Sequence, residues 1–296
     1  MPEYVENRDI DREKWDKCIE RSCFETIYPY SWYLDLTAAH WDGIIQGDYE
    51  AVFPVTWNIK HGIHYVFPPL LTQQLGIFSS EAPGVQQVDD FLRKLPGKFK
   101  HVEINLNASN PPSARSFRTS RRVNYELDLS DGYSKIQKGY STNTTRNIRK
   151  SEERSLIIKR IDADEFMALK QRCGGAGNKD LESRLTTIFS SLNNVNKGEI
   201  WGAWHNENLC AAVVWAFSKT RRIYLNSVSD EAGKETRAMF LLVNDFIQNN
   251  SGKLLVLDFE GSMIPGIARF FEGFGASRND YTRIRKSSFP LNIILK

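Results

Sequence analysis

The chain has 296 residues, of which 41% are hydrophobic and 25% are charged, and its formal net charge is +3. Such a composition is ordinary for a globular protein, and a prior of about 150 residues per domain predicts two domains, each large enough to bury a core. The small net charge does not by itself indicate a nucleic-acid-binding protein.

Cysteine, histidine and hydropathy patterns exclude further classes of protein. The four cysteines form no C-x-x-C pair, so we expect reduced thiols and a cytoplasmic protein rather than a disulfide framework. The five histidines have no spacing typical of a metal site, and no metal is expected. The charged N-terminus lacks the apolar segment of a signal peptide. The longest clearly apolar run, 209–217, is far shorter than the roughly 20 residues of a membrane helix, so no membrane span is expected.

The first half of the chain predicts helices, then strands, then a helix and a strand. Helices are expected at 11–20 and 31–40, strands punctuated by glycine and proline between 43 and 78, a helix near 85–95 and a strand at 101–107. The segment 121–130 is expected to be a strand that links this half to the next.

The second half opens with helical signals from about 131 to 154, interrupted near Gly139. On the second of these helices Arg146 and Lys150 share a face, with Arg149 adjacent. This basic face could bind an anionic substrate: a nucleotide sugar, the phosphates of CoA, or a tRNA. The alternative is a solvated helix face whose cations pair with the glutamates that follow.

The sequence next predicts a strand at 156–161 and a helix capped by Asp162 and Glu165. An amphipathic helix near 181–192 and a hairpin at 199–218 follow. After them, RRIYLNSVS (221–229) predicts a strand, DEAGKET predicts a turn, and a helix is expected at 237–249. KLLVLDFEG (253–261) then predicts a buried strand, and the last predicted element is a helix at 264–276.

The turn between the strand 221–229 and its helix predicts an anion-binding site. The first amides of a helix have no intrahelical partner and, with the helix dipole, favour an anion. Here these amides belong to about Lys234–Ala238, and Lys234 and Arg237 add positive charge. A pyrophosphate would fit this position. The alternative interpretation is that Gly233 only makes a tight turn.

Taken whole, the stretch 221–276 resembles the cofactor-binding half of the GNAT acyltransferase superfamily. In that family an acyl-CoA pyrophosphate lies on a Q/R-x-x-G-x-G/A turn, and the pantetheine arm enters where two strands splay apart. More narrowly, PGIARFFEGFG (265–275) and STNTTRNIRKSEER (141–154) are similar to two segments of the Fem-type branch, the aminoacyl transferases of peptidoglycan bridge synthesis.

The resemblance implies an α/β (α+β) fold of two tandem GNAT-like domains, each with a mixed, mostly antiparallel sheet flanked by helices. These would be an N-terminal domain at 1–130 and a C-terminal domain at 131–296 that holds the acyl-donor cleft. The cofactor-binding residues would be Asn226, Ser227, Val228, Ser229, Gly233, Lys234, Thr236, Arg237 and Ala238.

The sequence also departs from the family at functional positions. Gly233 and Thr236 stand where the family has Q/R and glycine, although Ala238 matches the final small residue. Phe271 stands where many GNAT enzymes have a tyrosine as general acid and where Fem-type proteins tend to have lysine. Another group would then do the proton transfer, or the domain is less catalytic than its fold suggests.

Acyl transfer needs a deprotonated amine, a polarised carbonyl and a protonated leaving group. Asp258 and Glu260 alternate onto one face of the strand 253–261 and are the candidate bases, with Glu260 preferred because it lies nearer the mouth of the cleft. The alternative has Asp258 paired with an Arg or Lys and Glu260 exposed. Tyr224 and Tyr281 are candidate acids, and Asn226, Ser227 and Ser229 could donate to pantetheine or to the oxyanion.

Three functions follow from these residues and the resemblance. The leading one is transfer of an acyl group from acetyl-CoA or another acyl-CoA to a small-molecule amine. The second is Fem-type transfer from aminoacyl-tRNA to a cell-wall precursor, which is less favoured because the chain has no long heptad hairpin. The third is a non-catalytic GNAT-like protein that binds a ligand or partner.

Overall fold

The computed structural model describes residues 1–111, 117–174, 178–261 and 263–288. The chain divides into two compact units, one formed by residues 1–123 with the segment that begins at residue 279, and the other by residues 124–278. In each unit helices flank a mixed, mostly antiparallel sheet, as predicted.

The strands of the first unit are β1 (Pro2–Val5), β2 (His40–Gln46), β3 (Ala51–Lys60), β4 (Ile63–Val66), β5 (Phe78–Ser79), β6 (Phe99–Leu106), β7 (Arg118–Arg122) and β15 (Tyr281–Ser287). Over the described residues they form an eight-stranded sheet in the order β1-β2-β3-β4-β6-β15-β7, with β5 paired to β3. Paired strands are antiparallel except β4 and β6, which run parallel.

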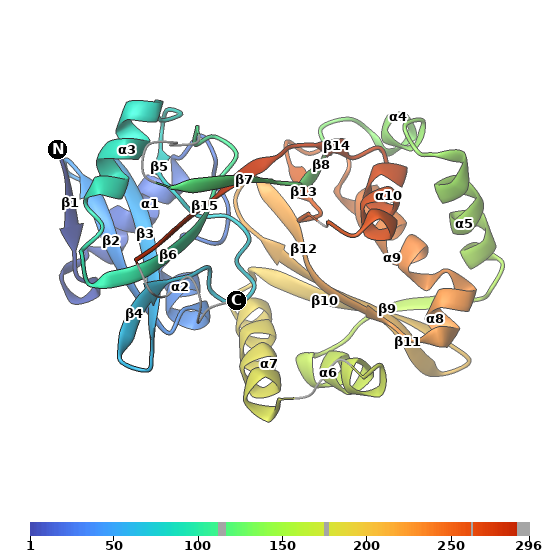
Figure 1. The fold of residues 1–296 in the computed structure, drawn as a ribbon. Coiled ribbons are helices and arrows are strands. Elements are labelled where there is room, and N and C mark those ends of the chain that lie inside the picture. The colour runs from blue at the N-terminus through green and yellow to red at the C-terminus, as the bar shows by residue number, and fades with distance from the viewer. Residues whose placement is uncertain (112–116, 175–177, 262, 289–296) are drawn as a thin grey trace. The chain divides into compact units, whose positions relative to one another are not determined.

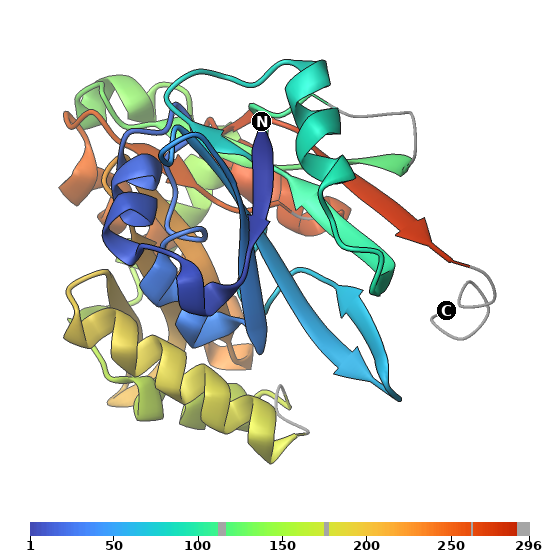
Figure 2. The ribbon, with the colours of Figure 1, turned by 90° about the vertical axis from the view of Figure 1, so that its left-hand side faces the viewer.

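The helices of the first unit are η1 (Asn7–Asp9), α1 (Arg12–Glu20), α2 (Ser31–Thr37) and α3 (Val85–Arg93). Helices α1 and α2 lie on one side of the sheet and α3 lies on the other (Figure 2). Phe53 of β3 packs against Phe91 of α3, with ring centroids 6.3 Å apart, and Val102 of β6 belongs to the same buried core. This layering buries the apolar stripe of each helix against the sheet.

The C-terminal segment differs from its predicted place. Residues from 279 onward were assigned to the second domain, but β15 pairs with β6 and β7 in the first sheet. A strand sequence does not identify its partner, and both partners of β15 lie more than 150 residues earlier in the chain. Strand β15 therefore lies between β6 and β7 and joins β7 to the rest of the first sheet.

The strands of the second unit are β8 (Tyr125–Asp128), β9 (Ile157–Arg160), β10 (Gly198–His205), β11 (Asn208–Phe217), β12 (Arg221–Ser229), β13 (Val256–Asp258) and β14 (Ser277–Arg278). Within the described part of this unit they form a seven-stranded sheet in the order β14-β8-β13-β12-β11-β10-β9. Only β12 and β13 pair in parallel.

The helices of the second unit are α4 (Tyr133–Gln137), α5 (Thr142–Glu152), α6 (Ala163–Arg172), α7 (Lys179–Asn194), α8 (Glu231–Thr236), α9 (Ala238–Asn250) and α10 (Pro265–Gly273). Helices α6 and α7 lie on one side of the sheet, and α5, α9 and α10 lie on the other (Figure 1). On the α9 side Trp215 of β11 stacks on Phe246 of α9, with ring centroids 3.7 Å apart.

Local sequence signals account for several helix ends in this unit. The predicted capping box of α6 is present, because Asp162 accepts from the Glu165 amide while the Glu165 carboxylate accepts from the Asp162 amide. Ser141 caps α5 by accepting from the Thr144 amide at 3.1 Å. Gly275, with φ +80°, follows α10, where a left-handed residue ends a helix.

No helix of the described ranges has the length and apolar composition needed to cross a membrane.

Candidate functional site

The sheet of the second unit opens beside β12. This strand pairs with β11 from Arg222 to Ser229, but its parallel pairing with β13 joins only 221–223 to 256–258. Beyond Ile223, β12 therefore has no strand partner on the β13 side among the residues that the structure covers. This is the separation of two strands that the resemblance implies, and it leaves one edge of β12 with unpaired backbone groups.

Two local features cause the separation. In the pairing of β11 with β12, Trp215 faces Tyr224 and Val214 faces Asn226, so Leu225 is an extra residue that forms a β-bulge and increases the local twist. On the other side β13 ends at Asp258, and the next amide, of Phe259, donates to the Tyr125 carbonyl of β8 at 3.0 Å. Strand β12 therefore twists away from β13, while the chain at the end of β13 stays bonded to β8.

The predicted strand 253–261 is consequently too long. Regular pairing stops at Asp258, and Glu260 lies beyond it in a left-handed conformation with φ +53°. The two-residue alternation that placed Asp258 and Glu260 on one strand face does not extend to Glu260. The Glu260 amide donates instead to the Asp258 carboxylate at 2.9 Å.

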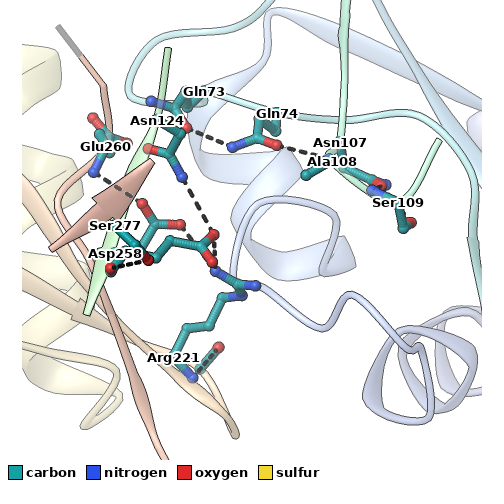
Figure 3. A network of polar contacts seen from close by, with 12 residues as sticks. Gln73, Gln74, Asn107, Ala108, Ser109, Asn124, Arg221, Asp258, Glu260 and Ser277 are labelled. Atoms are coloured by element: carbon teal, nitrogen blue, oxygen red, sulfur yellow. Dashed lines mark hydrogen bonds and ion pairs between the residues drawn. The ribbon is translucent and has the colours of Figure 1, made fainter. Parts of the chain in front are cut away.

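Asp258 lies in a buried ion cluster. Arg221 at the start of β12 contacts both Asp258, at 3.2 Å, and Glu126 of β8, at 2.6 Å (Figure 3). Burial raises the pKa of Asp258 to about 6, while the neighbouring guanidinium lowers it and the Glu126 carboxylate raises it further. This is the pairing that the alternative interpretation predicted for Asp258, and it fixes β13 to β12 and β8.

The predicted turn before α9 is the short helix α8. Asp230 caps it by accepting from the Gly233 amide at 2.9 Å. The Lys234 amide donates to the Asp230 carbonyl at 3.0 Å and the Arg237 amide to the Lys234 carbonyl at 3.3 Å. The amides of Lys234 and Arg237, which were expected to bind an anion, are therefore already paired.

The first turn of α9 begins one residue later. Arg237, with φ +62°, ends α8 and precedes α9. The amides that open α9 belong to Ala238 and Met239, and neither donates to a backbone carbonyl of the described residues. The guanidinium of Arg237 is exposed and donates to the Lys234 carbonyl at 3.0 Å. A helix terminus with free first amides thus lies at the predicted place, with fewer such amides than predicted.

Other residues predicted to bind the cofactor at this turn have structural roles. A Cβ on Gly233 would overlap the Cys210 carbonyl of β11 and the Ser229 hydroxyl, so only glycine lets α8 lie this close to the sheet. The Thr236 hydroxyl donates to the Ala232 carbonyl at 2.7 Å within α8. Lys234 pairs with Glu231, one turn earlier.

The unpaired half of β12 presents half-buried side chains, at Asn226, Ser227, Val228 and Ser229. Asn226 accepts from Lys170 of α6, with 3.0 Å between Nζ and Oδ1. Ser229 lies against α8, where its hydroxyl donates to the Asp230 carbonyl at 3.4 Å. The structure therefore brings all four predicted residues to the opening.

Tyr224 lies at the bulge, on the α9 side of the sheet. Its hydroxyl contacts the Met239 sulfur at 3.1 Å, and its ring meets that of Phe271 edge to face at 5.7 Å. Burial raises the pKa of Tyr224, so the phenol stays protonated at physiological pH and can donate a hydrogen bond. The structure thus places a phenol beside Phe271, whereas Tyr281 belongs to β15 of the first unit.

The basic residues of α5 point away from its packed face. The helix buries Thr144 and Ile148, and leaves Arg146, Arg149 and Lys150 exposed. Arg149 lies 3.5 Å from Glu153, one turn later, as the solvated-face interpretation expects.

Lys170 is the residue that sequence reasoning missed. It follows Phe166 by four residues on α6, so the two side chains lie on the same side of the helix. That spacing was available in the sequence, but nothing local indicates that the amine reaches a strand 56 residues later.

The first unit has a corresponding place where β4 stops and β6 continues, and there the chain itself fills the gap. The Leu75 amide donates to the Asn105 carbonyl at 2.8 Å, and the Asn107 amide donates to the Leu75 carbonyl at 2.7 Å. Leu75 also forms an isolated parallel bridge with Leu106 of β6. This neighbourhood carries hydrogen-bonded amide side chains, including Gln74 and Asn107 (Figure 3).

The described residues contain no group of three or more His, Cys, Asp or Glu side chains placed to hold a metal ion.

Comparison with known proteins identifies the fold. No protein-family model matches the sequence, and no curated protein sequence matches it. Among solved structures, FemX matches with a TM-score of 0.68 at 10% identity, over 97% of this chain and 98% of that one. A tandem GNAT protein from the clavulanic acid biosynthesis pathway matches with a TM-score of 0.55 at 11% identity, over 98% and 99% of the two chains. A GNAT-family acetyltransferase from Colwellia psychrerythraea matches with a TM-score of 0.53 at 10% identity, over 97% and 100%. The fold is therefore GNAT-like and of the Fem type, as the resemblance implied.

Proposed function

We propose that this protein is an acyltransferase that moves an acyl group from a CoA-type thioester to an amine, with the donor bound in the C-terminal GNAT-like unit. The observation that carries this proposal is the opening beside β12, a strand whose edge has unpaired backbone groups and whose Tyr224 contacts Met239 in the first turn of α9.

An extended donor fits such an edge for a physical reason. The amides of a pantetheine arm can pair with the free N–H and C=O groups of β12, as an added strand would. The phosphates that follow would meet the first amides of α9 and the Arg237 guanidinium, both of which favour an anion. A single extended, phosphorylated molecule satisfies both halves of the site.

The side chains around the opening can supply the chemistry. The Tyr224 phenol stays protonated and would protonate the departing thiolate. Asn226 and Ser227 would hold the pantetheine or the oxyanion. Of the two predicted bases, Asp258 is held by Arg221, and Glu260 lies half-buried beyond the end of β13.

The first unit is not proposed as a second donor site. The segment around Leu75 already pairs with both sides of the strand edge that would be needed there. A donor would have to displace these two backbone hydrogen bonds before it could bind.

Binding of CoA and acetyl-CoA tests the proposal directly. A ligand that binds only the folded state stabilises it by about 2.7 kcal/mol at 100 times its Kd, so the melting temperature should rise. Arg237→Glu should abolish the rise, and Arg93→Glu, at an exposed arginine of α3 in the first unit, serves as the matched control. If wild-type protein shows neither a shift nor calorimetric binding with millimolar CoA, the donor assignment is wrong and a non-catalytic role is favoured.

A second candidate is Fem-type transfer from aminoacyl-tRNA to a cell-wall precursor. It is favoured by the exposed cations of α5, two of which, Arg146 and Lys150, form no ion pair within the described residues. Binding of charged tRNA with a steep salt dependence, weakened by Arg146→Glu and Lys150→Glu, would support it. Equal binding by these variants and wild-type protein would exclude this surface.

A further inference from the structure

Lys170 holds a primary amine at the opening beside β12. Helix α6 packs against β11 and β12, and the Lys170 ammonium lies 5.8 Å from the ring centroid of Phe166, so its stem is covered by apolar surface. The amine donates to Asn226 at 3.0 Å. Asn226 belongs to the half of β12 that β13 leaves unpaired.

The amine reaches the sheet from the side opposite Tyr224. Asn226 pairs with Val214 and Tyr224 with Trp215, and the bulge at Leu225 separates the two pairs. Tyr224 contacts Met239 of α9, whereas Asn226 contacts α6. A proton-accepting group and a proton-donating group thus lie on the two faces of one short strand segment.

The surroundings of Lys170 are poor in charge. No carboxylate forms an ion pair with it within the described residues, and the titratable group that acts on its pKa is Cys173, just after α6, whose thiolate form would raise it. Among packed elements, Glu182 of α7 accepts from Gln171 instead. On β12, Lys170 contacts the neutral side chain of Asn226. Val214 of β11, which pairs with Asn226, is apolar.

This environment disfavours the charged form of the amine relative to an exposed lysine. Burial lowers the pKa of Lys170 from its ordinary value, because the ammonium loses hydration without gaining a counter-ion. A lowered pKa raises the fraction of neutral amine, and the neutral amine is the form that can accept a proton.

We propose that Lys170 is a catalytic residue, the proton acceptor for the amine nucleophile, an inference that rests on the proposed acyl transfer. The neutral Lys170 amine takes one proton from the attacking amine as the N–C bond to the acyl carbon forms. The C–S bond then breaks, and the leaving thiolate takes a proton from Tyr224. The Lys170 ammonium returns its proton to the tyrosinate through solvent, so the site ends in its starting state.

Competitive labelling tests the assignment without knowledge of the acceptor. Acetic anhydride acylates only neutral amines, so labelling of each lysine over pH 6–10, read by peptide mass spectrometry, gives its titration. The pKa of Lys170 obtained from labelling should be lower than that of the exposed Lys135. Lys135 serves as the matched internal control and pairs with Asp131 at 2.9 Å. Saturating CoA should slow labelling of Lys170 at least tenfold and leave that of Lys135 unchanged. Asn226→Leu, which removes the contact, should change the labelling of Lys170 alone.

The outcomes separate this inference from the proposed function. The assignment of Lys170 is overturned, while the donor site stands, if CoA binds but does not protect Lys170 from labelling. The same holds if the two lysines, Lys170 and Lys135, have equal pKa values. If calorimetry finds no CoA binding, the proposed function fails, and the role of Lys170 fails with it. Lowered titration together with protection by CoA supports both.

Discussion

Replacing Arg221 with methionine removes the cation that two buried carboxylates share. The side chains of Arg221, Glu126 and Asp258 are 10%, 14% and 2% exposed. Methionine keeps an apolar stem of similar length, so the change is mainly electrostatic. Removing one partner of such a buried group costs about 3–5 kcal/mol, because the remaining charges lose their compensation. A domain is stable by only about 5–15 kcal/mol, so the second unit should be severely weakened.

The deficit of Arg221→Met should depend on pH with a defined sign. The pKa of Asp258 is about 6 in the folded protein, against an ordinary value of 3.8. The folded state therefore binds this proton more tightly than the unfolded state. The associated stability is fully present below about pH 4 and is lost as the pH rises through 6. Without Arg221 the folded pKa should rise further, so the deficit should be largest at pH 7 and smaller at pH 5.

Urea unfolding followed by circular dichroism at pH 7 and pH 5 measures both effects as shifts of the midpoint at constant slope. Arg149→Met is the matched control, because its side chain is 83% exposed and its partner Glu153 is 3.5 Å away. The control should change stability by no more than about 0.5 kcal/mol. Equal midpoints for the two variants at pH 7, or a deficit that grows on acidification, would refute the reasoning.

Three further variants address the site and its support. Gly233→Ala should destabilise the protein by about 1–3 kcal/mol in thermal unfolding, because the new methyl group would overlap β11 backbone, while Gly266→Ala, with nothing near its Cβ, should not. Tyr224→Phe keeps the ring contacts and should bind CoA like wild-type protein, but should lower kcat in acetyl-CoA-dependent transfer about 10²- to 10⁴-fold; unchanged kcat would exclude it as the acid. Asp162→Ala removes the cap of α6 and should cost about 1 kcal/mol, and an unchanged urea midpoint would contradict this.

Features that depend on neighbours in the chain were predictable from the sequence. Strand β12 spans the predicted residues, and α10 starts at Pro265, because β-branched alternation and the fixed φ of proline act locally. The capping box of Asp162 and Glu165 was predictable for the same reason, since its two hydrogen bonds join residues three positions apart. The resemblance of 141–154 and 265–275 then indicated the fold.

Features that depend on distant residues were decided by the tertiary structure. The alternation of KLLVLDFEG predicts a longer strand, but β13 stops at Asp258, where its pairing with β12 ends and the chain soon turns at Glu260, whose φ is +53°. The segment before α9 was predicted to be a turn, but it forms the helix α8, which lies close to β11 because Gly233 has no side chain.

The candidate site shows the same limit. The contact of Lys170 with Asn226 spans 56 residues, and that of Arg221 with Asp258 spans 37. No local pattern encodes such pairs. The sequence alone determined which strand and helix would form the opening, and only packing across the sheet decided that Arg221 holds Asp258 and that Lys170 meets Asn226. The reason is physical: burial and ion pairing set the protonation of these groups, and both arise only once distant segments come together.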